Sequence, residues 1–274
     1  MNIIGLGTVG CDIAAQFLQY KQFTVYKIGE DIDNDNQSFC IPTFEKPEQY
    51  ETSFPPIPFE LKDELTLILS GEDTCSLSCL RILEQYKDLE LKIIYIKPDL
   101  KFMNPIQKMV DRVVYSVLQE LTRSAKISLM YLVDLKLVAD ILGKVSLKER
   151  QTKLYSTLAY SYYMKNMFEN IQSVYEKTID TPSTYGIRTF GVMDFETGIE
   201  KNFFPLDNIR EKSYNYYIVK QELEEDTDLF DHIEQQINTK FSEEQKVSYH
   251  IFESNLDSTT VFVEYKSPYI QGIV

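Results

Sequence analysis

The chain has 274 residues, 43% of them hydrophobic, so it can bury one large core or two modest ones. Its formal net charge is −14 and it contains no lysine or arginine run, which argues against a primary role in binding DNA or RNA. It shows neither an apolar run long enough to span a bilayer nor a secretory leader, so we expect a cytoplasmic protein without membrane partners.

A strand, a glycine turn and a helix are predicted in direct succession at the start of the chain. Residues 2–6 form an apolar run, Gly5, Gly7 and Gly10 follow G-x-G-x-x-G spacing, and residues 11–20 have helical character. Glycines at this spacing let the backbone approach a phosphate, and a helix N-terminus adds partial positive charge behind it. The pattern indicates a domain that holds a nucleotide or descends from one that did.

Strands and helices continue to alternate up to about residue 145. Near-continuous apolar runs predict strands at residues 23–28, 65–69, 92–96 and 127–133, as in a parallel sheet covered on both faces. Helices are predicted at residues 76–86 and 105–123, and the proline-rich residues 31–63 read as a long irregular loop. The helix at 105–123 carries apolar residues at helical spacing that we expect to face the core: Ile106, Met109, Val110, Val113, Val114, Val117, Leu118 and Leu121.

A single long helix is predicted next. Residues 146–178 contain neither glycine nor proline, and a helix of that length would span roughly 45–50 Å. Its apolar and aromatic side chains predict burial along much of its length, as in a spine between two domains. We therefore expect a nucleotide-binding-type α/β domain over residues 1–145, a central helix over 146–180 and a small α+β domain over 181–274.

The last part of the chain has a different pattern. Two apolar runs, residues 187–192 and 199–204, flank a turn that ends in Thr197-Gly198, which predicts a hairpin. Further strands are predicted at residues 214–220, 246–252 and 259–265, with an amphipathic helix at 228–241. We expect a mixed sheet with a helix on one face.

This order of elements resembles the tubulin/FtsZ family, and some local sequence agrees. The stretch Gly7-Thr8-Val9-Gly10-Cys11 is similar to the family's first nucleotide loop, and residues 65–76 lie where the family has a strand and its glycine-rich signature. The strand at 92–96 continues into Lys97-Pro98 as in FtsZ proteins, and residues 127–137 resemble the strand and Asn-Asp-x-x-Leu segment before the central helix. The resemblance implies a Rossmann-like parallel-sheet domain, a central helix, a smaller α+β domain, and GTP or GDP with magnesium as the ligand.

The departures from the family concern the nucleotide site. The family signature is Gly-Gly-Gly-Thr-Gly-Ser/Thr-Gly, whereas this chain has Gly71-Glu72-Asp73-Thr74-Cys75-Ser76. Glu72 and Asp73 would place carboxylates beside a polyphosphate, which repels like charge. The central helix lacks the guanine-reading Asn or Asp, and residues 176–182 lack the Asn-x-x-Asp spacing of the hydrolysis loop. We therefore expect no catalytic residues and a lost GTPase activity.

The favoured interpretation is a non-catalytic structural or assembly protein that acts through self-association or protein partners and needs no cofactor. Its composition, rich in Lys, Asn, Ile, Tyr and Asp, and its short length suggest a phage product, present in the host cytoplasm or the virion. The cysteines Cys11, Cys40, Cys75 and Cys79 are read as reduced thiols without a metal site, because too few further ligands accompany them.

Two alternatives stay open. The first is a divergent GTP-binding, polymer-forming GTPase; if a nucleotide binds, the residues expected to hold it are Gly5, Gly7, Thr8, Gly10, Cys11, Gly71 and Thr74. The second is an NAD(P)-dependent oxidoreductase, because the glycine spacing and its strand–turn–helix context also fit a dinucleotide. In that case the ribose-binding acid would be Glu30 or Asp31, both slightly late in the chain, and no catalytic constellation follows.

Overall fold

The structure is a computed structural model that describes residues 1–178, 186–242 and 244–272. Six parallel strands form the N-terminal part of its sheet, and the five predicted ones agree with the structure to within two residues at each end. The strands are β1 (Asn2–Leu6), β2 (Thr24–Gly29), β3 (Ser38–Cys40), β4 (Glu64–Ser70), β5 (Glu90–Lys97) and β6 (Leu129–Asp134).

The helices of this part connect the strands as crossovers. They are α1 (Gly7–Ala15), α2 (Gln49–Thr52), α3 (Cys79–Gln85), α4 (Pro105–Arg123), α5 (Leu135–Leu142) and α6 (Leu147–Phe168), with 3-10 turns η1 (Gln16–Gln19), η2 (Thr74–Ser78) and η3 (Leu100–Phe102). The first helix begins four residues earlier than predicted. The prediction of an irregular loop over residues 31–63 is wrong where β3 adds an edge strand beside β2 and where α2 forms one turn.

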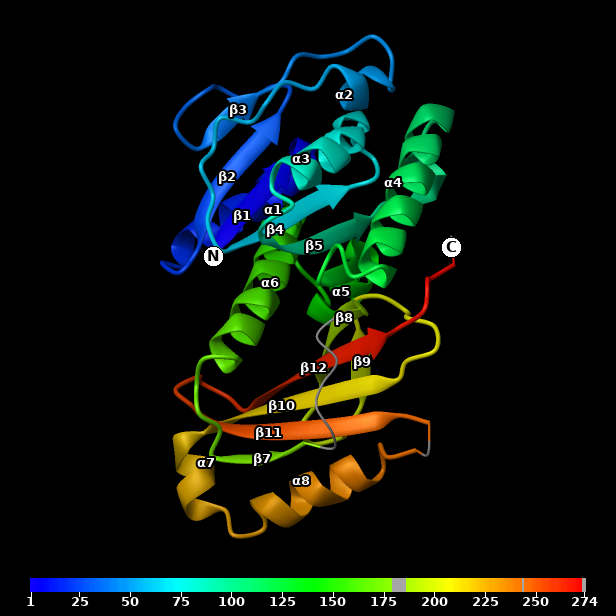
Figure 1. The fold of residues 1–274 in the computed structure, drawn as a ribbon. Coiled ribbons are helices and arrows are strands. Elements are labelled where there is room, and N and C mark those ends of the chain that lie inside the picture. The colour runs from blue at the N-terminus through cyan, green and yellow to red at the C-terminus, as the bar shows by residue number, and fades with distance from the viewer. Residues whose placement is uncertain (179–185, 243, 273–274) are drawn as a thin grey trace.

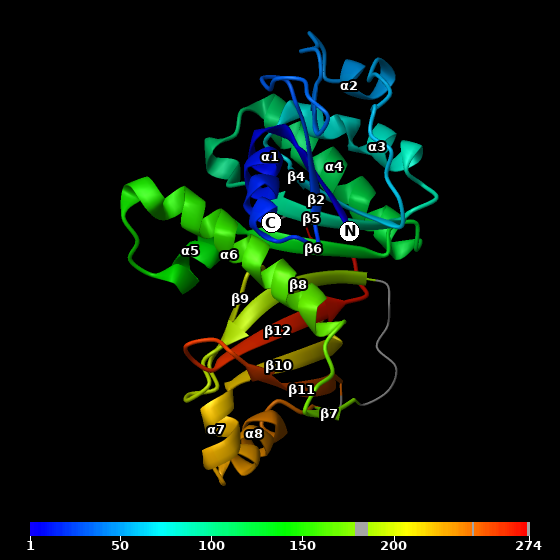
Figure 2. The same cartoon turned by 90° about the vertical axis from the view of Figure 1, so that its left-hand side faces the viewer.

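The sheet separates two layers of helices (Figures 1 and 2). On one face α1, α5 and α6 pack on Ile3, Ile94 and Val133, and on the other α3 and α4 pack on Leu67 and Ile93. The strands are buried on both faces because each face carries a helical layer, which is why they read as continuous apolar runs.

Helix α4 has the predicted bounds, since Asn104 and Gln107 form a reciprocal capping box and Pro105 occupies the first turn. The prediction that its whole apolar set faces the core is wrong. Val110, Val114 and Leu118 are buried, and other members point outward to solvent: Ile106, Met109 and Val113 are 51%, 47% and 44% exposed. The helix therefore has two apolar faces, of which the sheet covers one.

Helix α6 lies between the two parts of the molecule, as the central helix was predicted to do (Figures 1 and 2). The buried Tyr162 packs edge-on against Phe17, Tyr131 and Phe190, which come from three different elements. The predicted length is wrong, because α6 has 22 residues, or about 33 Å. The chain leaves the helix after Phe168, and the short strand β7 (Tyr175–Lys177) pairs with β11 instead.

The C-terminal part adds a mixed sheet covered by a helix on one face, as predicted (Figure 1). Its further elements are β8 (Gly186–Met193), β9 (Glu200–Asn202), β10 (Glu211–Val219), α7 (Lys220–Glu225), α8 (Leu229–Asn238), β11 (Lys246–Ser254) and β12 (Thr260–Ser267). The predicted hairpin is present as β8 and β9, with Gly198 at φ 66° in its turn. Strand β8 also pairs in parallel with β6, so among the described residues the two parts share one 12-stranded sheet.

No helix in the described ranges is both long enough and apolar enough to cross a membrane.

Candidate functional site

Two loops meet at the carboxyl edge of neighbouring strands. Strands β1 and β4 pair in parallel with Leu6 opposite Leu69, so the first glycine loop (residues 5–11) and the second glycine loop (residues 70–76) emerge side by side. In parallel α/β sheets ligands bind in the crevice at this edge. The topology therefore brings together the residues that the sequence singled out as nucleotide-binding candidates.

The first glycine loop is closed by contacts within the protein itself. A methyl group on Gly5 would lie 2.4 Å from the Gly10 carbonyl oxygen, and one on Gly10 would lie 2.4 Å from the Ile68 carbonyl oxygen. Helix α1 thus packs directly on the backbone of β1 and β4, at a separation that only glycine allows. Packing alone accounts for these two glycines.

Gly7 starts α1 with φ 75°, and an acidic side chain lies against it. A methyl group on Gly7 would be 2.5 Å from Asp73 Oδ2, and the Val9 amide donates a hydrogen bond to the same oxygen at 3.4 Å. A helix N-terminus favours an anion through its free amides and its dipole. Here the carboxylate of Asp73, from the second glycine loop, supplies that anion.

The environment of Asp73 raises its pKa from 3.8 to about 6. Burial is the main cause, and the nearby charges of Glu72 and Glu30 act in the same direction, whereas the amides of Val9 and Thr8 favour the charged form. Burial also raises the pKa of Glu72. The carboxylates are thus partly desolvated and repel one another at the place where a phosphate would have to enter.

The other candidates of the first and second loops lie around this contact. Thr8 is exposed on α1 and Thr74 is half-buried at the start of η2. Cys11 is buried, its thiol lies 3.3 Å from the Gly5 carbonyl oxygen and 3.4 Å from that of Ile28, and burial raises its pKa to about 11. The Cys11 side chain is therefore a buried, protonated member of the loop rather than a reactive thiol.

A buried charge network supports the second glycine loop, and sequence reasoning missed it. The carboxylate of Asp111 on α4 forms an ion pair with the ammonium of Lys97, with Nζ and Oδ2 2.6 Å apart. It also accepts a hydrogen bond from the Tyr95 hydroxyl at 2.7 Å. A methyl group on Gly71 would lie 2.3 Å from the Tyr95 hydroxyl and 2.4 Å from Asp111 Oδ1. The available signals were an aspartate on the buried face of α4 and a lysine at the end of an apolar strand.

Helix α6 borders the first glycine loop, next to α1. Gln151 donates to the Tyr155 hydroxyl at 3.1 Å and lies 3.5 Å from Asp12 Oδ2 on α1. Tyr155 is buried, so an aromatic side chain fills this side of the loops. Of the predicted hydrolysis-loop segment, residues 179–182 lie outside the described residues.

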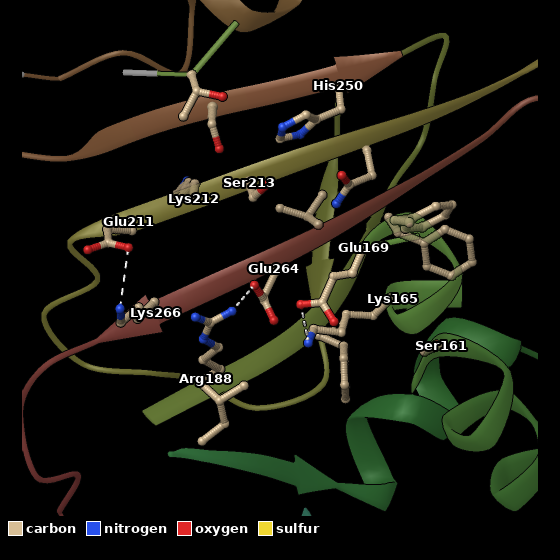
Figure 3. Close-up of a pocket in the computed structure, with 18 of the residues that line it drawn as sticks. Ser161, Lys165, Glu169, Arg188, Glu211, Lys212, Ser213, His250, Glu264 and Lys266 are labelled. Carbon is tan, nitrogen blue, oxygen red and sulfur yellow. Dashed lines mark hydrogen bonds and ion pairs between the residues drawn. The ribbon is translucent and has the colours of Figure 1, made fainter. Parts of the chain in front are cut away.

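Two large cavities lie away from the glycine loops. One, of about 680 Å³, lies between α6 and the C-terminal sheet, and the other, of about 710 Å³, lies between α3 and α4. Neither is lined by a residue of the first or second glycine loop. In the first cavity charged side chains pair with one another: Arg188 with Glu264, Lys165 with Glu169, and Lys266 with Glu211 (Figure 3).

Metal-binding groups do not gather in the part of the chain that the structure describes: no three His, Cys, Asp or Glu side chains are placed to share an ion. The four cysteines are free, and only Cys40 is not fully buried.

No family model and no curated protein sequence matches this chain. Solved structures do. A GTPγS-form protofilament of TubZ from Bacillus thuringiensis serovar israelensis matches with a TM-score of 0.66 and 9% identity, over 96% of this chain and 86% of that one. The four-stranded filament of TubZ-Bt matches with a TM-score of 0.68 and 13% identity, over 97% and 85%. An empty FtsZ dimer of M. jannaschii matches with a TM-score of 0.63 and 10% identity, over 97% and 87%.

Proposed function

With the tubulin/FtsZ fold as the premise, we propose that this chain is a non-catalytic structural protein that self-associates without a bound nucleotide. The observation that carries the proposal is the position of Asp73, whose carboxylate lies on Gly7 and the Val9 amide at the N-terminus of α1. The protein's own anion satisfies the site that a phosphate would need, and Glu72 adds a second negative charge beside it.

Self-association is supported by the structures that share the fold. They are described as protofilaments, a four-stranded filament and a dimer, and each matches nearly the whole of this chain. A fold that keeps its surfaces after losing a ligand can still assemble through them. A phage origin, suggested by composition alone, stays part of the proposal, as does the division at residues 145 and 180.

The oxidoreductase alternative has less support. Dinucleotide-binding domains use an acid at the end of the second strand to bind the ribose. Glu30 follows β2 directly, but its carboxylate accepts a hydrogen bond from the Tyr50 hydroxyl. That acid is thus engaged by a side chain of α2.

Calorimetric titration of the protein with GTP, GDP and NAD(H), each with and without magnesium, tests the proposal. We expect no binding heat with any of them. The double variant E72G/D73G removes both carboxylates and restores two glycines of the family signature, so it should gain GTP binding. The matched control E45Q/E48Q removes two exposed carboxylates elsewhere and should gain none.

Micromolar binding of GTP by the unmodified protein would overturn the proposal and favour the polymer-forming GTPase, whose GTP-dependent sedimentation would be measured next. Binding of NAD(H) alone would favour the oxidoreductase. Sedimentation velocity without nucleotide tests the assembly part: we expect concentration-dependent growth, and a monomer at all concentrations would contradict it.

A further inference from the structure

The outer face of α4 carries an apolar stripe without a partner among the described residues. Phe102, Ile106, Met109 and Val113 are 87%, 51%, 47% and 44% exposed. Their spacing of four, three and four residues places them along one side of the helix and the turn before it. A row of exposed apolar side chains at this spacing is the pattern of a helix face that packs on another protein surface.

The stripe has a positive border, although the whole chain carries a charge of −14. Lys101, Lys108 and Arg112 are exposed, and none of them has an acidic partner within 4 Å in the described ranges. Lys108 and Arg112 are one helical turn apart and flank the same side of the stripe. The stripe and these three cations together form what we call the α4 surface. Its chemistry fits a partner that offers exposed apolar groups bordered by carboxylates.

The opposite end of the same molecule offers that chemistry. Between residues 221 and 239 there are seven acidic residues and no lysine or arginine. Six of the seven are exposed on α7, on the turn after it and on the start of α8: Glu222, Glu224, Glu225, Asp226, Asp228 and Asp231.

An exposed aromatic pair lies beside these carboxylates. Phe230 and Tyr175 are each 38% exposed, and their rings meet edge-on with centroids 5.0 Å apart. Tyr175 belongs to β7, at the edge of the described sheet, so the pair extends the surface across two elements. The six carboxylates and this pair form what we call the acidic surface.

We propose that the α4 surface of one copy of this chain binds the acidic surface of a second copy. The apolar stripe would pack on Phe230 and Tyr175, and the cations would face the carboxylates of α7 and α8. The two views place α4 in the upper half of the molecule and α7 and α8 at its lower end (Figures 1 and 2). Each bound copy therefore presents its second surface to a further copy, and such a heterologous contact repeats into a ring or an open filament.

The contact rests on the proposed self-association, and it makes that self-association depend on salt. Exposed charge pairs weaken with ionic strength, so assembly without nucleotide should decrease steadily between low salt and about 0.5 M salt. Burial of the apolar stripe contributes binding free energy that salt does not screen, so some association should persist at high salt.

Complementary charge reversal tests the contact by sedimentation velocity at low salt. K108E/R112E reverses two of the three cations of the α4 surface, and E225K/D231K reverses two of the six carboxylates of the acidic surface. Each alone should weaken association about 100-fold, because each reversed side chain then meets like charge. An equimolar mixture of the two variants should recover association, since the new glutamates of α4 can pair with the new lysines of the acidic surface. This restoration also shows that both variants are folded.

The controls K144E/K148E and E45K/E48K change the net charge by the same amounts at exposed sites outside both surfaces, and they should assemble normally. If the unmodified protein is monomeric, both the proposed function and this contact are overturned. If it assembles and the reversals have no effect, or the mixture does not restore assembly, only the contact proposed here is overturned.

Discussion

In the first glycine loop, Gly5 and Gly10 lie against backbone atoms of β1, β4 and α1, whereas in the second loop Gly71 lies against the side chains of Tyr95 and Asp111. Glu72 and Asp73, the next two residues of the second loop, are half-buried and carry full side chains. Gly5, Gly10 and Gly71 thus lie where the interior has no room for a Cβ atom. The glycines Gly5 and Gly10 of the first loop are therefore explained by internal packing and are not by themselves evidence of a bound phosphate.

The largest expected effect comes from removing Asp111, the centre of the buried charge network beside the second glycine loop. Asp111→Ala leaves the buried ammonium of Lys97 without its partner, and we expect a loss of about 3–5 kcal/mol in the free energy of unfolding. Urea titration followed by circular dichroism measures it. Asp140→Ala, at an exposed site on α5, is the control and should change stability by less than about 0.5 kcal/mol. Equal stability of the two variants would contradict the assigned role of the pair.

A smaller loss is expected in the first loop. Gly5→Ala would place a methyl group 2.4 Å from the Gly10 carbonyl oxygen, and relieving that overlap should cost about 1–3 kcal/mol. Gly29→Ala is the matched control, because its methyl group would meet Ile32 at an ordinary 3.5 Å. If both variants unfold at the same temperature, packing does not explain why Gly5 is present.

The smallest effect concerns Asp73 and pH. Its folded pKa of about 6 lies above the ordinary 3.8, so the folded state holds a proton that the unfolded state has lost between these values. Stability from this group is therefore highest below pH 4 and falls as the pH rises through 6. Because the side chain is not fully buried and solvent screens its charge, we expect a difference of about 1 kcal/mol rather than the full value of the shift.

Asp73→Asn removes this titration and the repulsion with Glu72, so it should be about 1 kcal/mol more stable than the unmodified protein at pH 7.5. At pH 4 the two proteins should be equally stable. Thermal unfolding across this pH range compares them, and a constant difference at all pH values would contradict the assignment.

Local signals predicted much of the fold. Apolar runs located β1, β2, β4, β5 and β6, and apolar side chains at helical spacing located α4, because both patterns lie within short stretches of the sequence. The sequence singled out both glycine loops, and the parallel pairing of β1 and β4 in the structure brings them to one edge of the sheet.

Contacts between distant residues decided the rest. The end of α6 at Phe168 depends on β7 pairing with β11, about 75 residues further on, and no glycine or proline marks it. The outward turn of Ile106, Met109 and Val113 depends on where the sheet ends, because helical spacing alone does not say which apolar face is covered.

The sequence by itself determined that a glycine loop follows an apolar strand and that two carboxylates follow Gly71 in the second loop. Only the tertiary structure decided that Asp73 reaches the N-terminus of α1. Its carboxylate accepts a hydrogen bond from the Val9 amide, which lies 64 residues earlier in the chain. Local sequence sets each loop's conformational preference, whereas the parallel pairing of β1 and β4 sets which side chain fills the space between the loops.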